Sequence, residues 1–463
     1  MNQPIASMAS AVSDFLKRRA IYFKMAAIVI LTAFLLIPLS MIYSVLNERL
    51  ERRNEAVGDI TSVWGREQTI IGPVLIVPYR YSFKSWKEQP GPGGKIEKVE
   101  VTDTAVANAY FLPASLVING DIHPRQLRRG IYQAIVYTGK LDLSGQFVLP
   151  DFANLHIAEP DILWDDAQVT FAITDLRGVK ETLQLQWGES HVPLAPGCKL
   201  TGFTSGVHAR VGGLKDARGN IPVKFEVTLN GSGGIRFTPI AGENQVNIHS
   251  PWPNPSFQGA FLPSERAVNA NAFDATWQLT QYGRDYVQQW TDQEGAVGLN
   301  PSSVASSLFG VDFLSGIDSY RTVERAIKYG ILFFVLVFAA FFLFEILSGL
   351  RVHPFQYGLV GAALCLFYLG LLSLSEFIAF GLAYSIAALA TTLLISFYCA
   401  RVLKSGGRTL LVSGMLAAIY GFLYITLQLQ DYSLLFGTAG LFVVMTVVFY
   451  VTRNIDWYSR DRI

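Results

Sequence analysis

The chain has 463 residues, a length that accommodates two or three domains, and its 37 lysines and arginines almost balance its 36 aspartates and glutamates. This near-neutral charge gives no sign of a nucleic-acid-binding surface. The three cysteines show no metal-ligand spacing. Only Cys198 lies in the polar half, so that half has no internal disulfide framework.

The N-terminal part begins with a polar tail, residues 1–24, that contains Lys17, Arg18, Arg19 and Lys24. An apolar run of about 22 residues follows at 25–46, longer than the roughly 7–15 apolar residues of a signal peptide, and no A-x-A-like cleavage site precedes Asn47. We therefore expect an uncleaved transmembrane helix over 25–46. Because basic residues stay on the cytoplasmic side, the tail at 1–24 is predicted to be cytoplasmic.

Residues 47–326 are predicted to form a periplasmic, mainly β domain. The charged stretch 47–61 is typical of a short helix continuing out of the membrane. From about residue 72 to 310, short runs rich in Val, Ile, Phe and Tyr alternate with Gly, Pro, Asn and Asp. In FEVTL (225–229) apolar and polar residues alternate, as in a half-solvated antiparallel sheet. We expect a sandwich or paired sheets. Residues 84–98, rich in Pro, Gly and charge, are predicted to be a loop with a mobile tip.

Five further apolar runs predict a transmembrane bundle over 327–452, followed by a cytoplasmic tail at 453–463. We place these spans at about 329–348, 356–374, 378–400, 409–427 and 433–452. Basic residues fall in alternate connections, at Arg351, at 401–408 and after 452, whereas the other connections carry acidic residues and no basic ones. The fold class is thus a polytopic α-helical membrane protein of about six helices, with both termini in the cytoplasm.

Four ionisable residues at the ends of spans are the candidate functional residues of the membrane part: Glu345, Arg351, His353 and Glu376. An ionisable group inside a span is costly and is a candidate functional group by default. One interpretation is a local pair of Glu345 with Arg351 or His353 that holds the hairpin turn. The other is a proton or ion relay, although Glu345 and Glu376 lie at opposite ends of their helices.

In the polar half, Trp252, Phe257 and Phe261 lie in the proline-rich segment SPWPNPSFQGAFLP. This segment is predicted either to dock a partner or to cap the open end of a sheet. An acidic stretch from Asp151 to Asp166 lacks the spacing of a calcium loop, so we interpret it as a solvated loop. The motifs G-x-S-x-G and H-E-x-x-H are absent. No catalytic, cofactor-binding or metal-binding residue is therefore predicted.

Several segments carry a resemblance to a known family. They are WGREQTIIGPVLIVPY (64–79), RRGIYQAIVY (128–137), GQFVLP (145–150), SPWPNPSFQGAFLP (250–263), SYRTVERAIKYGILFF (319–334) and HPFQYGLVGAALCLFYLGLLSLSE (353–376). With these segments the chain resembles the CreD family of bacterial inner-membrane, cell envelope integrity proteins. The resemblance implies an inner-membrane location, a periplasmic middle domain, and a role in envelope stress with tolerance of colicins and cell-wall antibiotics.

The preferred functional hypothesis is non-enzymatic: a membrane-anchored envelope-integrity factor whose β domain contacts a periplasmic or envelope component. A transporter or channel-like accessory is the alternative, because Gly358, Gly361, Gly370 and Gly381 supply small surfaces for close helix packing. Few charges lie within the spans and no inverted repeat is evident, which counts against transport. A periplasmic hydrolase is a third hypothesis without a supporting motif. The expected partners are the lipid bilayer and an envelope protein, with no nucleic acid and no cofactor.

Overall fold

The computed structural model describes residues 20–90, 96–179, 181–294, 298–314, 319–348, 352–429 and 432–453. The chain divides into two compact units, one formed by Met1–Asn54 with Ile317–Ile463 and the other by Glu55–Gly316. We call them the helical unit and the β unit.

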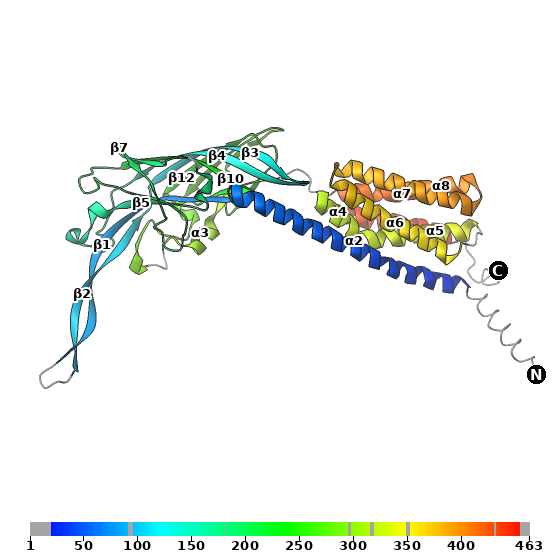
Figure 1. Cartoon of the computed structure of the whole chain (residues 1–463), viewed down its shortest axis with the longest axis horizontal. Helices are drawn as coiled ribbons and strands as arrows, with labels where there is room; N and C mark the ends of the chain where they lie inside the picture. Colours follow the sequence, from blue (N-terminus) through cyan, green and yellow to red (C-terminus); the bar gives the residue numbers. More distant parts are fainter. Residues whose placement is uncertain are drawn as a thin grey trace, which may run out of the picture. The chain divides into compact units, whose positions relative to one another are not determined.

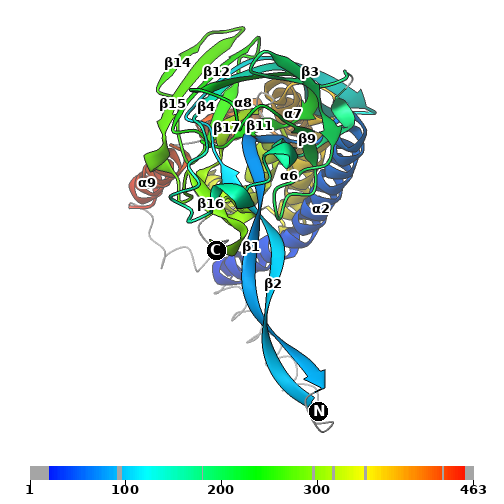
Figure 2. The ribbon, with the colours of Figure 1, turned by 90° about the vertical axis from the view of Figure 1, so that its left-hand side faces the viewer.

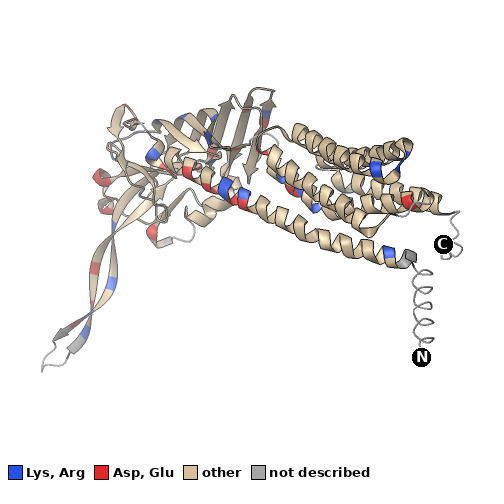
Figure 3. Cartoon of the chain, turned by 45° about the vertical axis from the view of Figure 1, so that its right-hand side comes forward, with Lys and Arg blue, Asp and Glu red and all other residues tan. Residues whose placement is uncertain are grey.

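Helices make up the described part of the helical unit (Figure 1). They are α2 (Ala20–Trp64, whose last ten residues belong to the β unit), α4 (Ser319–Lys328), α5 (Gly330–Ser348), α6 (Pro354–Ser375), α7 (Phe380–Leu403), α8 (Gly406–Gln428) and α9 (Ser433–Thr452). Within the described residues, α2 and α5 to α9 are the six helices long and apolar enough to cross a membrane. Charged residues gather near the helix ends and are sparse along the middles (Figure 3). These six helices confirm the predicted helical part of the fold class.

The core of the helical unit is aromatic and centres on α6. The Phe367 ring of α6 lies 4.7 Å, centroid to centroid, from the Tyr420 ring of α8, and Phe333 of α5 lies 4.9 Å from the same ring. Gly361 of α6 allows α2 to approach closely, because a Cβ at this position would lie 2.3 Å from Leu35 Cδ1 and 3.0 Å from Phe338 Cζ. The glycine therefore sets the packing of the first span against the bundle.

The β unit contains two sheets (Figures 1 and 2). The nine-stranded sheet consists of β1 (Gln68–Pro90), β2 (Ile96–Phe111), β5 (Gln168–Ile173), β8 (Ala195–Pro196), β9 (Gly206–Arg210), β11 (Gly234–Phe237), β13 (Pro255–Gly259), β16 (Gln289–Thr291) and β17 (Phe309–Phe313). The eight-stranded sheet consists of β3 (Ser115–Arg129), β4 (Tyr132–Phe147), β6 (Gln184–Trp187), β7 (Ser190–Pro193), β10 (Ile221–Ser232), β12 (Glu243–Ser250), β14 (Glu265–Val268) and β15 (Phe273–Thr280). The unit also holds helix α3 (Pro301–Ser307) and the 3-10 turns η1 (Glu159–Asp161), η2 (Trp164–Asp166), η3 (Leu176–Gly178), η4 (Gln281–Gly283) and η5 (Asp292–Glu294).

Most strand pairs are antiparallel, while β1 pairs in parallel with β11 and β3 with β12. The alternation read from FEVTL holds on β10, where Phe225, Val227 and Leu229 are buried and Glu226 is exposed. A shared core of buried residues joins the sheets, and the Phe171 ring of β5 lies 4.4 Å from the Phe225 ring of β10. Two paired sheets over one core confirm the predicted β part of the fold class.

The prediction of a loop over 84–98 was wrong. β1 and β2 pair from Leu75 opposite Phe111 to Pro90 opposite Ile96, so most of this segment is strand and only 91–95 lie outside the described residues. Cross-strand ion pairs accompany the extension: Lys84 Nζ lies 2.9 Å from Glu100 Oε1, and Lys87 Nζ lies 2.6 Å from Asp103 Oδ1. The charges that suggested a solvated loop thus belong to paired strands.

Candidate functional site

Glu345 lies near the C-terminal end of α5 and is buried, with its side chain 8 % exposed. Its Oε1 atom forms an ion pair with Lys24 Nζ of α2 and accepts a hydrogen bond of 2.9 Å from the Val352 backbone N–H. Its Oε2 atom accepts a hydrogen bond of 2.8 Å from the Tyr357 hydroxyl of α6. Both carboxylate oxygens are thus satisfied, as a charged group in a membrane span requires.

Lys24 completes this network, which we call the Lys24 clamp (Lys24, Glu345, Val352 and Tyr357). Its ammonium group also donates a hydrogen bond of 2.5 Å to the Val352 carbonyl and lies 5.8 Å from the centroid of the Tyr357 ring. The clamp therefore ties the first span to α5 and to the turn that precedes α6. Lys24, the Val352 N–H and the Tyr357 hydroxyl all donate to Glu345, which is the arrangement of a structural anchor.

His353 has a different role from the local pair considered for it. It is the N-cap of α6, where its Nδ1 accepts a hydrogen bond of 3.2 Å from the Phe355 N–H. In return, its own backbone N–H donates to Gln356 Oε1 at 2.9 Å, which forms a reciprocal capping box. The structure brings Glu345 to Lys24 and Val352, and it places His353 in the cap. Arg351 lies outside the described residues.

Glu376 is the C-cap of α6, and its side chain is 7 % exposed. Its Oε1 atom lies 3.6 Å from Arg49 Nε of α2 and accepts a hydrogen bond of 3.3 Å from the Tyr320 hydroxyl of α4. We call this group the Arg49 clamp (Arg49, Glu376 and Tyr320). It fixes the same long helix to the bundle a second time.

The two clamps lie at opposite ends of the membrane-spanning part of α2. Lys24 and Arg49 are 25 positions apart on one helix, which corresponds to about 37 Å at a rise of 1.5 Å per residue. A bilayer's hydrocarbon core is about 30 Å thick, so each clamp falls near one boundary of a membrane of that thickness. Glu345 and Glu376 therefore belong to separate networks.

The three aromatic residues considered for partner docking lie against the core of the β unit. Phe257 packs edge-on against Phe273 and Trp277, each at 5.8 Å between ring centroids. Phe261 packs against Phe309 at 6.1 Å. The Trp252 indole N–H donates a hydrogen bond of 3.0 Å to the Leu314 carbonyl. Their geometry is that of intramolecular packing.

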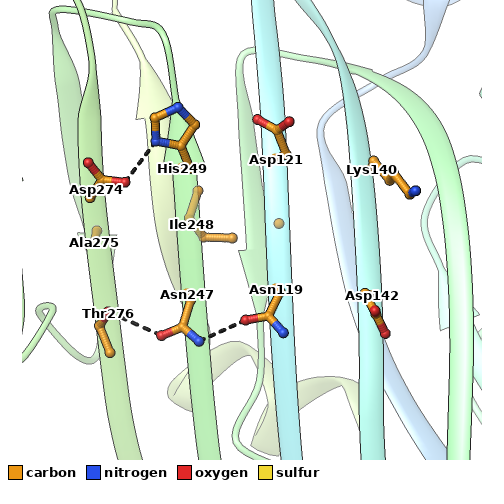
Figure 4. Close-up of a pocket in the computed structure, with 11 residues that line it drawn as sticks. Asn119, Asp121, Lys140, Asp142, Asn247, Ile248, His249, Asp274, Ala275 and Thr276 are labelled. Carbon is orange, nitrogen blue, oxygen red and sulfur yellow. Dashed lines mark hydrogen bonds and ion pairs between the residues drawn. The ribbon is translucent and has the colours of Figure 1, made fainter.

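A polar hollow of about 400 Å³ lies on the outer face of the eight-stranded sheet (Figure 4). His249 Nδ1 lies 2.7 Å from Asp274 Oδ1, and Asn247 Nδ2 donates to Asn119 Oδ1 at 2.8 Å. These groups satisfy one another, and no serine or cysteine lines the hollow. Among the described residues no group of three His, Cys, Asp or Glu side chains has metal-binding geometry, and this includes the acidic stretch from Asp151 to Asp166.

The family model described as inner membrane protein CreD matches residues 20–458. The chain is also similar to the inner membrane protein CreD of Escherichia coli (strain K12), with 29 % identity over 439 residues, which cover 95 % of this chain and 94 % of that protein.

Proposed function

Because the chain belongs to the CreD family of inner membrane proteins, we propose that it is a non-enzymatic protein that supports cell envelope integrity and the response to envelope stress. This role extends to tolerance of colicins and of antibiotics that act on the cell wall. In this proposal residues 47–326 are periplasmic, both termini are cytoplasmic, and the β unit contacts an envelope component. The clamps hold the membrane helices as a scaffold for that unit.

One feature of the β unit supports the proposed contact. The hairpin formed by the outer parts of β1 and β2 extends away from the other strands of its unit (Figures 1 and 2). We call residues 80–90 and 96–106 the arm. The pairing of β1 with β5 ends at Ile76, before the arm begins. The pairing of β2 with β16 covers Ala109 to Phe111, after the arm ends. Within the described part of the chain, the strands of the arm therefore pair only with each other.

The arm exposes large apolar side chains on both faces. Phe83 is 43 % exposed and Val99 40 %, on one face, while Trp86 is 68 % exposed and Val106 60 %, on the other. A two-stranded ribbon is marginally stable in water by itself, and its free edges present unpaired backbone N–H and C=O groups. These features support docking of an extended protein segment along an edge, with the aromatic residues anchoring it.

Shortening the arm tests this proposal. Ser82 lies opposite Thr104 in the register, so replacing residues 83–103 with Asn-Gly leaves a two-residue hairpin of the same register. The variant is expressed in a strain that lacks the protein, at matched protein level, and survival under envelope stress is compared with the full chain. We expect loss of rescue with normal membrane insertion.

A matched point variant separates the contact from the fold. Phe83→Thr with Trp86→Thr replaces two aromatic residues with a β-branched residue that also favours strands, and it removes the aromatic anchors. We expect it to reproduce most of the loss. Full rescue by both the shortened chain and the point variant would overturn the proposed role of the arm.

The transporter or channel-like alternative is favoured by one observation in the bundle. The Tyr368 hydroxyl of α6 is fully buried and has no hydrogen-bond partner among the described residues, which suits an internal water.

Residues 1–326 expressed alone test this alternative. Full rescue by this piece would make the five C-terminal helices dispensable and rule out transport. Loss of proton-coupled flux in Glu345→Gln and His353→Ala, tested separately, would favour it.

A further inference from the structure

The β3–β4 hairpin ends in a basic tip that the proposed function does not use. The basic tip consists of Arg125, Arg128, Arg129, Gly130, Ile131 and Tyr132. No acidic residue occurs between Ile122 and Thr138. The strands pair as far as Arg129 opposite Tyr132, so Gly130 and Ile131 form a two-residue turn. Gly130 has a φ of 61°, the positive value that the first position of such a turn requires.

Two contacts of the basic tip fix the course of the hairpin along the last turns of α2. The Arg125 guanidinium lies 4.2 Å from the centroid of the Trp64 ring, and Arg129 forms an ion pair with Asp59. Trp64 is the last residue of α2 and Asp59 comes five positions earlier. From Arg125 to the turn, the hairpin therefore runs along residues 59–64 in the direction of the N-terminus of α2.

Arg128 and Ile131 of the basic tip are exposed to solvent. Arg128 is exposed and has no ion pair with any residue that the structure describes, and Ile131 at the turn is 38 % exposed. Tyr132 follows directly in the sequence. Arginines beside an aromatic and an aliphatic side chain are typical of segments at a bilayer–water boundary.

We infer that the basic tip binds the anionic phospholipid headgroups of the bilayer that the chain itself spans. Guanidinium groups pair with phosphate oxygens in a bidentate geometry. The charge of Arg128, which has no ion pair with a described residue, complements an anionic surface, and Ile131 supplies the apolar contact. The hairpin runs along residues 59–64 in the direction in which the chain leads back to the apolar span, which favours the membrane over a soluble protein as the occupant.

The test uses the full-length protein in lipid nanodiscs, with Cys198, Cys365 and Cys399 replaced by alanine. A fluorophore is attached through Ile131→Cys, and its quenching by a nitroxide placed on the lipid headgroup is measured. The control label is attached through Glu189→Cys in the β6–β7 hairpin. That hairpin has the same two-residue turn with a glycine of positive φ, Gly188.

We expect strong quenching at position 131 and little at position 189 when the bilayer contains phosphatidylglycerol. Quenching at 131 is expected to weaken in pure phosphatidylcholine and in 1 M salt. Arg128→Gln should lower the equilibrium constant for contact between the basic tip and the bilayer about fivefold, which is the effect of one arginine near an anionic surface. Arg128→Lys should retain most of this contact. Equal quenching at 131 and 189 would overturn the inference. Quenching at 131 that changes neither with lipid charge nor with Arg128→Gln would also overturn the inference, because such quenching would show apolar contact without headgroup binding.

Discussion

Lys24 and Glu345 are 321 positions apart in the chain and form a buried ion pair between the first span and α5. The pair lies at one end of an interface in which Leu35 and Leu39 of α2 are buried in the bundle core. Arg49 and Glu376 close the other end. The first helix is thus held by charge at both ends and by apolar packing between them.

Removing one partner of the Lys24 clamp leaves the other charge buried. We therefore expect Lys24→Met and Glu345→Gln each to lower the free energy of unfolding by about 3 kcal/mol. The double variant should be less destabilised than the sum of the two single variants. Denaturant titration of the full chain in detergent measures the free energy of unfolding of the two single variants and the double variant.

The control is Glu48→Gln on the same helix. Glu48 lies 2.5 Å from Arg52, and the two side chains are 57 % and 56 % exposed. Exposed pairs of this kind contribute less than about 1 kcal/mol. If Glu48→Gln lowered the free energy of unfolding as much as the Lys24 clamp variants do, burial of the ion pair would not determine its contribution to stability.

The Arg49 clamp is predicted to contribute less. Arg49 is 39 % exposed and lies 3.6 Å from Glu376, so solvent screens much of the attraction. We expect Arg49→Ala to cost about 1 kcal/mol in the same titration. A cost equal to that of Lys24→Met would contradict this expectation.

Local sequence patterns predicted the helices and strands but not the clamps. The spans follow from the length of the apolar runs, and the sheets from alternation such as that of Phe225, Val227 and Leu229. The sequence offers Arg351 and His353 as partners of Glu345, whereas Lys24 reaches Glu345 only through tertiary packing. Lys24 was interpreted as an orientation signal alone. The only sign of the clamps in the sequence is that Lys24 directly precedes the apolar run 25–46 and Arg49 closely follows that run.

The arm was missed for a different reason. The PGPGG sequence at 90–94 is a strong turn signal, and it led to a loop prediction for its charged flanks as well. Those charges form cross-strand pairs such as Lys87 with Asp103, and the register of such pairs becomes visible only after strand pairing is known.

Phe257 distinguishes packing from docking in the proline-rich segment. Because its ring packs against Phe273 and Trp277, Phe257→Ala is expected to lower the free energy of unfolding by about 2 kcal/mol. Leu262→Ala in the same segment is the control, since Leu262 is 66 % exposed and should change stability by less than about 0.5 kcal/mol. Unchanged stability of Phe257→Ala together with lost rescue in cells would favour docking instead.

The proposed orientation of the chain predicts opposite accessibility of two connections. We expect a membrane-impermeant maleimide to label Glu189→Cys in intact spheroplasts. Ser405→Cys should react only after permeabilisation, because the basic residues Arg401, Lys404 and Arg408 predict a cytoplasmic location for its connection. Both variants are made in a background without native cysteines. Labelling of Ser405→Cys in intact spheroplasts would reverse the assigned orientation.

Asp175 in the β unit makes stability depend on pH. The Arg177 side chain donates hydrogen bonds of 2.9 Å and 2.6 Å to its carboxylate, and with the Arg177 and Arg66 backbone N–H groups it lowers the pKa of Asp175 to about 2. The unfolded chain has the ordinary value near 3.8, so the contribution is fully present above about pH 4 and is lost as the pH falls towards 2. This contribution of Asp175 amounts to about 2 kcal/mol.

Asp175→Asn should remove this contribution. The difference in free energy of unfolding between wild type and Asp175→Asn should therefore narrow between pH 5 and about 2 in denaturant titrations of the full chain. Asp216→Asn, in an exposed loop, is expected to follow the wild-type curve, and a constant difference between wild type and Asp175→Asn across this range would refute the assignment.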